Sequence, residues 1–429
     1  MQSDSKPETR NWAPRFFTIW TGQAFSLFGS ALVQFALVWW LTQKTGSATV
    51  LATSTMAALL PQIILGPFAG ALVDRWNRRV IMIVADASIA LATVLLIYLF
   101  ATDQIQVWHI YVIAAIRSLG GAFHHPAMTS STSLMIPEKH LARVAGANQT
   151  LQGLITIFAP PLGALLLELF STQNVLLIDV GTAMLAILPL LFIPIPRPPR
   201  QALQANGTME KTSYLHDLRE GFAYVVRWKG LLGLIILAML LNFLLVPSSS
   251  FLPLVITKIF NGGATELGWA ESLFGAGVIV GGITLSVWGG FKRRIVTSFS
   301  GIIGIGLGIV LIGFVPANLF YLLLIANLIV GFSQVFANGS LMAIMQSSVT
   351  PDMQGRVFSL LIAGATAMMP LSLLIAGPIS DQFGIRFWYI FGGSICIVMT
   401  IASTFVPAIM NIENNHNEAQ TPSPASAPE

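Results

Sequence analysis

Three charged residues of this 429-residue sequence fall deep inside long apolar stretches, where charge is costly. They are Asp86, Arg117 and Asp179. Such a charge is normally kept where it faces a partner or a water-filled path, and a carboxylate that is alternately buried and hydrated can bind and release a proton. We therefore expect proton coupling at these residues, with Asp86 and Arg117 ranked first. Two alternatives stay open: each carboxylate could be an ordinary packing group, and Arg117 could bond backbone carbonyls.

Charge also gathers in the stretch GALVDRWNRR, residues 70–79, although only 9% of all residues are charged. Asp74 ends an apolar segment, where the negative end of a helix dipole disfavours a carboxylate unless cations compensate. The glycine four residues earlier leaves room for another helix. This pattern predicts a latch that stabilises one conformation, formed by Gly70, Asp74, Arg75, Arg78 and the similarly spaced Asp381. The alternative is that the arginines only keep this loop on one side of a membrane.

The composition indicates a membrane protein. Hydrophobic residues make up 55% of the chain and the mean hydropathy is +0.75, far above a soluble domain. Uncharged stretches exceed the roughly 20 residues that a helix needs to cross a bilayer, and continuous apolar runs in lipid must be helical. The net charge of +4 comes from short scattered clusters, which argues against a nucleic-acid partner. A single cysteine, Cys396, and no phosphate-binding loop lead us to expect no metal and no cofactor.

Polar, Gly and Pro residues divide the apolar stretches into twelve predicted transmembrane helices. Their approximate ranges are 16–42, 47–73, 79–101, 106–135, 141–168, 173–194, 230–257, 266–290, 295–315, 318–346, 356–381 and 386–408. Nearly all of the 22 Lys and Arg residues then lie on one side, and the opposite loops hold only Lys44, Lys258 and Arg386. This bias places both termini in the cytoplasm and the protein in the cell (inner) membrane.

The only long hydrophilic interruption divides the helices into two halves of six. The segment IPEKHLARVAG at 136–146 is echoed by TPDMQGRVFSL at 350–360, a duplication typical of transporters built from repeats. We therefore predict an all-α membrane protein with two pseudo-symmetric six-helix bundles. Its expected parts are an N-terminal bundle at 1–195, a cytoplasmic linker with an amphipathic helix at 196–229, a C-terminal bundle at 230–408, and a disordered tail at 409–429.

Over nearly its whole length the sequence resembles the major facilitator superfamily. The signature Gly-x-x-x-Asp-Arg-x-Gly-Arg-Arg/Lys of that family is matched by Gly70, Asp74, Arg75, Arg78 and Arg79. Asn77 replaces a glycine. Because Asn is the other residue that tolerates a left-handed backbone, the exchange fits a tight left-handed turn at this position.

Two further motifs extend the resemblance. IRSLGGAFHH, residues 116–125, is similar to the Arg-x-x-x-Gly motif of helix 4, which implies proton coupling at Arg117, with Gly120 in place of the usual glutamine. FAPPLGA is similar to the antiporter signature Gly-Pro-x-x-Gly-Gly at Ala159, Pro160, Gly163 and Ala164, where close packing alone is the alternative. WWLTQKTGSATVLA and GRVFSL resemble the macrolide-efflux branch, whose relatives export drugs and siderophores. This branch implies outward transport driven by protons.

In a fold built from such repeats, four helices line a central path. Uncharged amides among aromatic side chains suit a bulky, largely apolar ligand with some hydrogen-bonding groups. The candidate cavity residues are Gln23, Phe28, Gln34, Phe123, His124, Asn242, Gln334 and Asn338. Any of the aromatic residues could instead face lipid or another helix.

The sequence thus predicts a monomeric exporter of a drug- or macrolide-like molecule, working by alternating access in exchange for protons in the lipid bilayer. An uncoupled uniporter and a lipid or siderophore transporter of the same fold remain alternatives. Outside this class stand a channel, a sensor and a polytopic membrane enzyme. An enzyme would need catalytic groups clustered at one interface, which the sequence does not offer.

Overall fold

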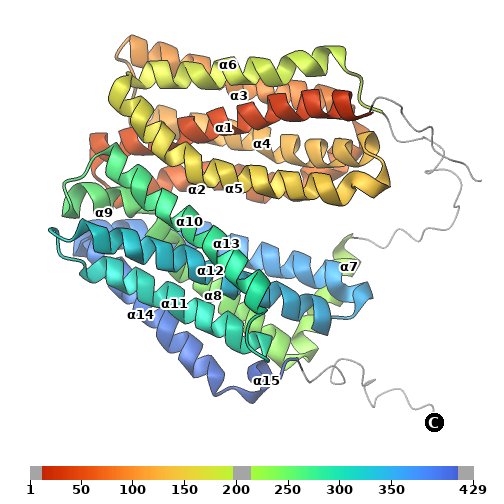
Figure 1. Cartoon of the computed structure of the whole chain (residues 1–429), viewed down its shortest axis with the longest axis vertical. Helices are drawn as coiled ribbons and strands as arrows, with labels where there is room; N and C mark the ends of the chain where they lie inside the picture. The colour runs from red at the N-terminus through yellow and green to blue at the C-terminus, as the bar shows by residue number, and fades with distance from the viewer. Residues whose placement is uncertain (1–11, 197–213, 414–429) are drawn as a thin grey trace, which may run out of the picture. The chain divides into compact units, whose positions relative to one another are not determined.

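The computed structural model describes residues 12–196 and 214–413, and all regular elements in these ranges are helices (Figure 1). The helices are α1 (Trp12–Thr45), α2 (Ala48–Arg75), α3 (Arg78–Ala101), α4 (Val107–Met135), α5 (Glu138–Leu169), α6 (Thr172–Phe192), α7 (Tyr214–Arg227), α8 (Lys229–Ser250), α9 (Leu252–Ile259), α10 (Ala264–Trp288), α11 (Arg294–Phe314), α12 (Phe320–Ser348), α13 (Pro351–Phe383), α14 (Ile385–Thr404) and α15 (Pro407–Met410). The predicted all-α class is confirmed.

Eleven of the helices described are long and apolar enough to cross a membrane. The remaining long helix is α4, with 29 residues. It carries Arg117, His124, His125 and a run of hydroxyl residues, which lower its hydropathy, and it packs against α2 and α3. Because α4 has the length and the neighbours of a span, we treat it as the twelfth transmembrane helix.

The predicted helix at 230–257 is divided in the structure into α8 and α9. Pro253 lies in the first turn of α9 and has no N–H to donate to the carbonyl four residues before it. The chain turns at Phe251, whose ring is fully buried and whose N–H bonds the carbonyl of Pro247. A continuous apolar run therefore contains two helices instead of one.

The chain forms two compact units. One comprises Met1–Gly207 with Ile256–Ser272, and the other Thr208–Val255 with Leu273–Glu429. The first turns of α10 thus pack with the N-terminal helices, although the sequence assigned all of α10 to the second bundle. The side chain of Ser272 explains part of this difference, since it donates a hydrogen bond to the carbonyl of Ile157 on α5 at 3.2 Å.

The same helix pairings occur inside each unit. In the first unit α1 packs on α5 and α6, and α3 packs on α4 and α6. In the second, α8 packs on α13 and α14, and α11 packs on α12 and α14. The pairs correspond because the second six-helix series repeats the order of the first, with α8 in the place of α1, α11 in that of α3, and α12, α13 and α14 in those of α4, α5 and α6. The pairing pattern supports the duplication inferred from the sequence.

The amphipathic helix α7 was expected and lies within the linker, whose residues 197–213 are outside the described ranges. It packs on α13, and Glu220 pairs with Arg356 at 2.7 Å. The start of the expected disordered tail is ordered, because α15 buries Ile409 and the following turn buries Ile412. Residues 414–429 of the tail lie outside the described ranges.

A contact between α1 and α6 tests this packing. A Cβ added to Gly22 on α1 would collide with the carbonyl oxygen of Leu185 on α6, whereas one added to Gly181 on α6 would meet no atom within 4 Å. We expect Gly22→Ala to lower the stability of the protein by about 1–3 kcal/mol. Gly181→Ala should raise it slightly, because alanine favours a helix. Thermal unfolding in detergent measures both, and equal melting temperatures for the two variants would contradict the packing.

Candidate functional site

A buried ion pair and two hydroxyl side chains bonded to it join four helices of the first unit. Nη1 of Arg117 on α4 lies 2.6 Å from Oδ2 of Asp179 on α6, and the two side chains are 11% and 1% exposed. Thr93 on α3 donates to the same oxygen at 2.8 Å and accepts from Arg117 at 2.7 Å. Ser30 on α1 donates to Oδ1 at 2.9 Å. We call these four residues the arginine cluster. Its carboxylate has a cation and two hydroxyl donors, which offset the cost of burial.

A second buried cluster surrounds Asp86 on α3. Gln23 on α1 donates to Oδ2 of Asp86 at 2.9 Å, and Nε2 of His124 on α4 lies 3.4 Å from Oδ1. Oε1 of Gln23 and Nε2 of His124 are buried without a hydrogen-bond partner among the described residues. We call these three residues the histidine cluster. Unpartnered buried polar atoms are costly, so this cluster has unused hydrogen-bonding capacity.

The two clusters form layers on the same three helices. Each of α1, α3 and α4 supplies one residue to each layer, seven positions apart: Gln23 and Ser30, Asp86 and Thr93, and His124 and Arg117. Seven residues are about two helical turns, so the layers are separated by about 10 Å along the helices. The order of the two residues is reversed on α4, as expected for a helix antiparallel to α1 and α3.

The two layers differ in the source of their positive charge. Arginine supplies a permanent charge, whereas histidine is charged only when it binds a proton. The sequence ranked Asp86 with Arg117, but the structure pairs Arg117 with Asp179 and leaves Asp86 to His124. It also brings Gln23 and His124, expected in the substrate cavity, to the carboxylate of Asp86.

The segment between α2 and α3 departs from the expected turn. Asn77 has φ −74° and caps α3, where its side chain accepts a hydrogen bond from the N–H of Arg79. The left-handed conformation expected at Asn77 is therefore wrong. Asparagine suits both roles, and here the N-cap role prevails. Arg79 donates to the carbonyls of Leu190 and Leu191 in the last turn of α6, where a cation is favourable.

The structure describes the side chains of some of the predicted latch residues but not of all. Arg75 is exposed, and Nη1 of Arg78 donates to the carbonyl of Ser130 at 3.3 Å. A Cβ added to Gly70 would meet no described atom within 4 Å. The side chain of Asp74 lies outside what the structure describes, and Asp381 is an exposed residue of α13 in the second unit. The latch therefore stays a prediction.

The antiporter-like motif on α5 serves as a packing surface. Gly163 faces α1, since an added Cβ would lie 2.9 Å from the ring of Phe35. Ala164 faces Gly268 on α10, where an added Cβ would lie 3.0 Å from the Cβ of Ala164 and from the Cα of Pro161. Small residues on both sides thus allow α1 and α10 to approach α5 closely.

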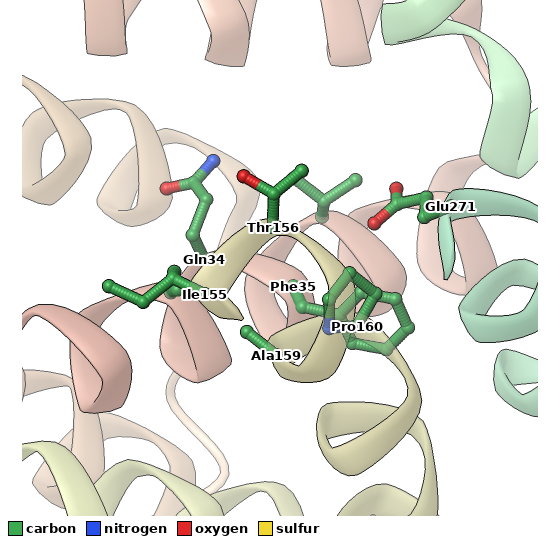
Figure 2. Close-up of a pocket in the computed structure, with 9 residues that line it drawn as sticks. Gln34, Phe35, Ile155, Thr156, Ala159, Pro160 and Glu271 are labelled. Carbon is green, nitrogen blue, oxygen red and sulfur yellow. The ribbon is translucent and has the colours of Figure 1, made fainter. Parts of the chain in front are cut away.

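A cavity of about 320 Å³ lies beside this packing surface. It is lined by Ala31, Gln34, Phe35, Val38, Ile155, Thr156, Ala159, Pro160 and Glu271. In the view of Figure 2 the polar ends of Gln34, Thr156 and Glu271 lie on one side, and Phe35, Ala159 and Pro160 on the other. The lining is mostly apolar with a few polar groups, as in small-molecule sites.

Of the residues predicted for the substrate cavity, only Gln34 lines it. Phe28 is half-buried on α1, and Phe123 packs on the hydrophobic cluster around Met82. Three candidates belong to the second unit and are not among the residues that line this cavity: Asn242, Gln334 and Asn338. The amide of Asn242 donates to the carbonyl of Ala238 on its own helix. The sequence did not predict Glu271 for the cavity, because this carboxylate stands near the outer end of the predicted helix 266–290 and ranked below the deeper Asp86 and Asp179.

The described residues contain no group of three or more His, Cys, Asp or Glu side chains placed to hold a metal. Two six-helix series with the same internal pairing, and charges buried among apolar helices, define a multi-pass membrane protein of the transporter type.

Comparison with known proteins agrees with this class. The model of the Major Facilitator Superfamily matches residues 19–249 and 231–427, so the chain belongs to this superfamily. It is 33% identical over 405 residues to Macrolide efflux protein A of Streptococcus pyogenes, covering 94% of this chain and 98% of that protein. It is 26% identical over 402 residues to Multidrug efflux pump Tap of Mycolicibacterium fortuitum, covering 90% and 94%.

Solved structures show the same fold. A mutant form of the nucleoside transporter NupG matches with a TM-score of 0.71 at 15% identity, over 92% of this chain and 99% of that one. A bacterial homologue of the iron transporter ferroportin in an inward-facing state matches with a TM-score of 0.70 at 13% identity, over 92% and 99%. The protein is thus a membrane transporter that handles small molecules, and the membrane-enzyme alternative is rejected.

The arginine cluster yields a stability prediction. Arg117→Gln leaves Asp179 buried without its cation, and Asp179→Asn leaves Arg117 without its anion. Each is expected to cost about 3–5 kcal/mol of folding free energy. The double variant should cost clearly less than the sum, because neither charge remains. Unfolding in detergent measures the cycle, and additive losses would show that the ion pair does not couple the helices.

Proposed function

We propose that this transporter exports a bulky, largely apolar small molecule, drug- or macrolide-like, across the cell membrane by alternating access in exchange for protons. The observation that carries the export function is the 33% identity to Macrolide efflux protein A, which spans nearly the whole of both chains. The similarity to Multidrug efflux pump Tap supports the same direction of transport. The clustering of Lys and Arg supports a position in the inner membrane with both termini in the cytoplasm.

The proposed proton site is the histidine cluster. A proton bound by Asp86 or His124 would lie between two groups whose heavy atoms are 3.4 Å apart. Both side chains are nearly inaccessible, at 5% and 11% exposure, so proton exchange requires a conformation that hydrates them. That requirement is what couples a proton to a change of access.

The arginine cluster has a different proposed role. Its charges are matched within the cluster, so Arg117 and Asp179 hold α4 and α6 together through the cycle while the histidine cluster changes its charge. The motif residues Ala159, Pro160, Gly163 and Ala164 serve the same mechanism by letting α5 pack closely against its neighbours. We propose that the protein acts as a monomer, since the arginine cluster and the histidine cluster are each formed by residues of a single chain.

Replacement of Asp86 tests the coupling. In proteoliposomes, Asp86→Asn is expected to lower proton-driven erythromycin transport and erythromycin-dependent proton movement about tenfold or more, within the usual range of coupling energies. Downhill exchange of the drug should persist. Asp103→Asn is the matched control, because Asp103 is exposed in a turn with φ 55° that asparagine also adopts.

The same assay contains the result that would overturn proton coupling. If wild-type transport is unchanged after the proton gradient is collapsed, the protein is an uncoupled uniporter. If Asp86→Asn and Asp103→Asn behave alike under a gradient, the histidine cluster is not the proton site.

The proposed latch comprises Gly70, Asp74, Arg75, Arg78 and Asp381, and it stabilises one access state. Asp74→Ala combined with Arg78→Ala is expected to slow transport roughly fivefold or more, because that state loses its stabilisation. Arg143→Ala, at an exposed arginine of α5, serves as the control. Initial rates of drug export from cells or vesicles measure the effect. Full transport by the double variant would refute the latch.

A further inference from the structure

Glu271 is a carboxylate in a mostly apolar cavity. It lies on α10, within the membrane-spanning length of that helix. No hydrogen bond or ion pair joins it to any of the described residues. The other polar groups that line the cavity, Gln34 and Thr156, are uncharged, and the remaining lining residues are apolar. A carboxylate in such a place is costly unless a positive charge or a proton compensates it.

The position of Glu271 is fixed by the docking of α10 on α5. Gly268 lies one turn before it and packs against Pro161 and Ala164. Ser272 follows it directly and donates to the carbonyl of Ile157. Thr265 donates to the carboxylate of Glu168 at 3.2 Å, which adds a third contact. These contacts hold α10 against α5 and so place Glu271 at the cavity. Figure 2 shows its side chain beside those of Thr156 and Pro160.

Two arginines of the first unit that are largely buried or bonded to helix carbonyls do not supply the compensating charge, because both have other partners. Arg117 is paired with Asp179, and Arg79 bonds the carbonyls at the end of α6. None of the residues that line the cavity is Lys, Arg or His. A cation that enters the cavity from outside would therefore find an unpaired anion with apolar walls on either side.

We propose that this cavity is a subsite for a protonated amine carried by an amphipathic substrate. The inference rests on the proposed export function and names the substrate chemistry that it favours. Glu271 pairs with the ammonium group, and Phe35, Val38, Ile155 and Pro160 contact the alkyl groups on its nitrogen. Gln34 and Thr156 bond hydroxyl groups next to the amine. A volume of about 320 Å³ is at the low end for small-molecule sites. It accommodates an amine-bearing sugar or ring, while the rest of a larger substrate lies outside it.

Two probes that differ only in charge test the subsite. Erythromycin carries a tertiary amine that is protonated at neutral pH, and its N-oxide keeps the scaffold without the net charge. Binding of each to purified full-length protein in detergent is measured without a proton gradient. Wild type should prefer erythromycin, and Glu271→Gln should weaken erythromycin binding roughly 10- to 100-fold, as for the loss of a charged hydrogen bond, and leave the N-oxide within about twofold.

Glu138→Gln is the matched control. It removes one negative charge, as Glu271→Gln does, but from an exposed residue at the other end of α5. It should bind both probes as wild type does. Glu271→Asp, which keeps the charge, should retain part of the preference for erythromycin. This variant keeps the test available if Glu271→Gln does not fold.

The outcomes separate the subsite from the function on which it rests. If wild type binds both probes equally, or if Glu271→Gln weakens both equally, the amine subsite is overturned while export stands. If Glu271→Gln binds both probes normally and loses only proton-driven transport, Glu271 is a proton site and the amine subsite is overturned. If wild type neither binds nor exports either probe, the proposed function is overturned and the subsite with it.

Discussion

The ion pair between Arg117 and Asp179 is the constraint on which the first unit depends. Neither charge could be buried alone at an acceptable cost, so Arg117 of α4 must reach Asp179 of α6, and the two side chains meet at 2.6 Å. Thr93 and Ser30 complete the coordination and draw in α3 and α1. In lipid, where apolar side chains gain little by contacting one another, such polar contacts specify which helices pack together. The second unit keeps the same pairings without this cluster, through contacts of its own.

Close packing of small residues adds a second constraint. Gly163 and Ala164 on α5 admit the ring of Phe35 on one side and Gly268 on the other. The resulting approach of α10 to α5 creates the cavity wall that carries Glu271. The motif on α5 that resembles the antiporter signature thus has a direct physical effect. Its small residues determine how close the carboxylate of Glu271 comes to α1 and α5.

The helices and their class could be predicted because uncharged runs in lipid have no other regular structure available. The break at Phe251 could not, because Pro247 is tolerated inside α8 while Pro253 begins a new helix, and both stand in one apolar run. Depth along a helix identified Asp86, Arg117 and Asp179 as buried, but it does not define the rotation of each helix, which decides that Arg117 meets Asp179. The cavity at Glu271 depends on residues more than a hundred positions apart, so spacing alone could not reveal it. Asn77 shows a different limit, since one residue type suits both a left-handed turn and a helix cap.

The seven-residue offset between the two polar layers has an electrical consequence. Because α1, α3 and α4 are continuous through both layers, a charge gained in the histidine cluster stands about 10 Å from the guanidinium of Arg117. At an effective dielectric constant of 20, two unit charges at that separation interact by roughly 2 kcal/mol, of which the Asp179 carboxylate beside Arg117 offsets a part. Ionisation of the histidine cluster therefore changes the electrostatic potential at the arginine cluster without any helix having to move. The fixed spacing of the two layers along the helices is what couples them.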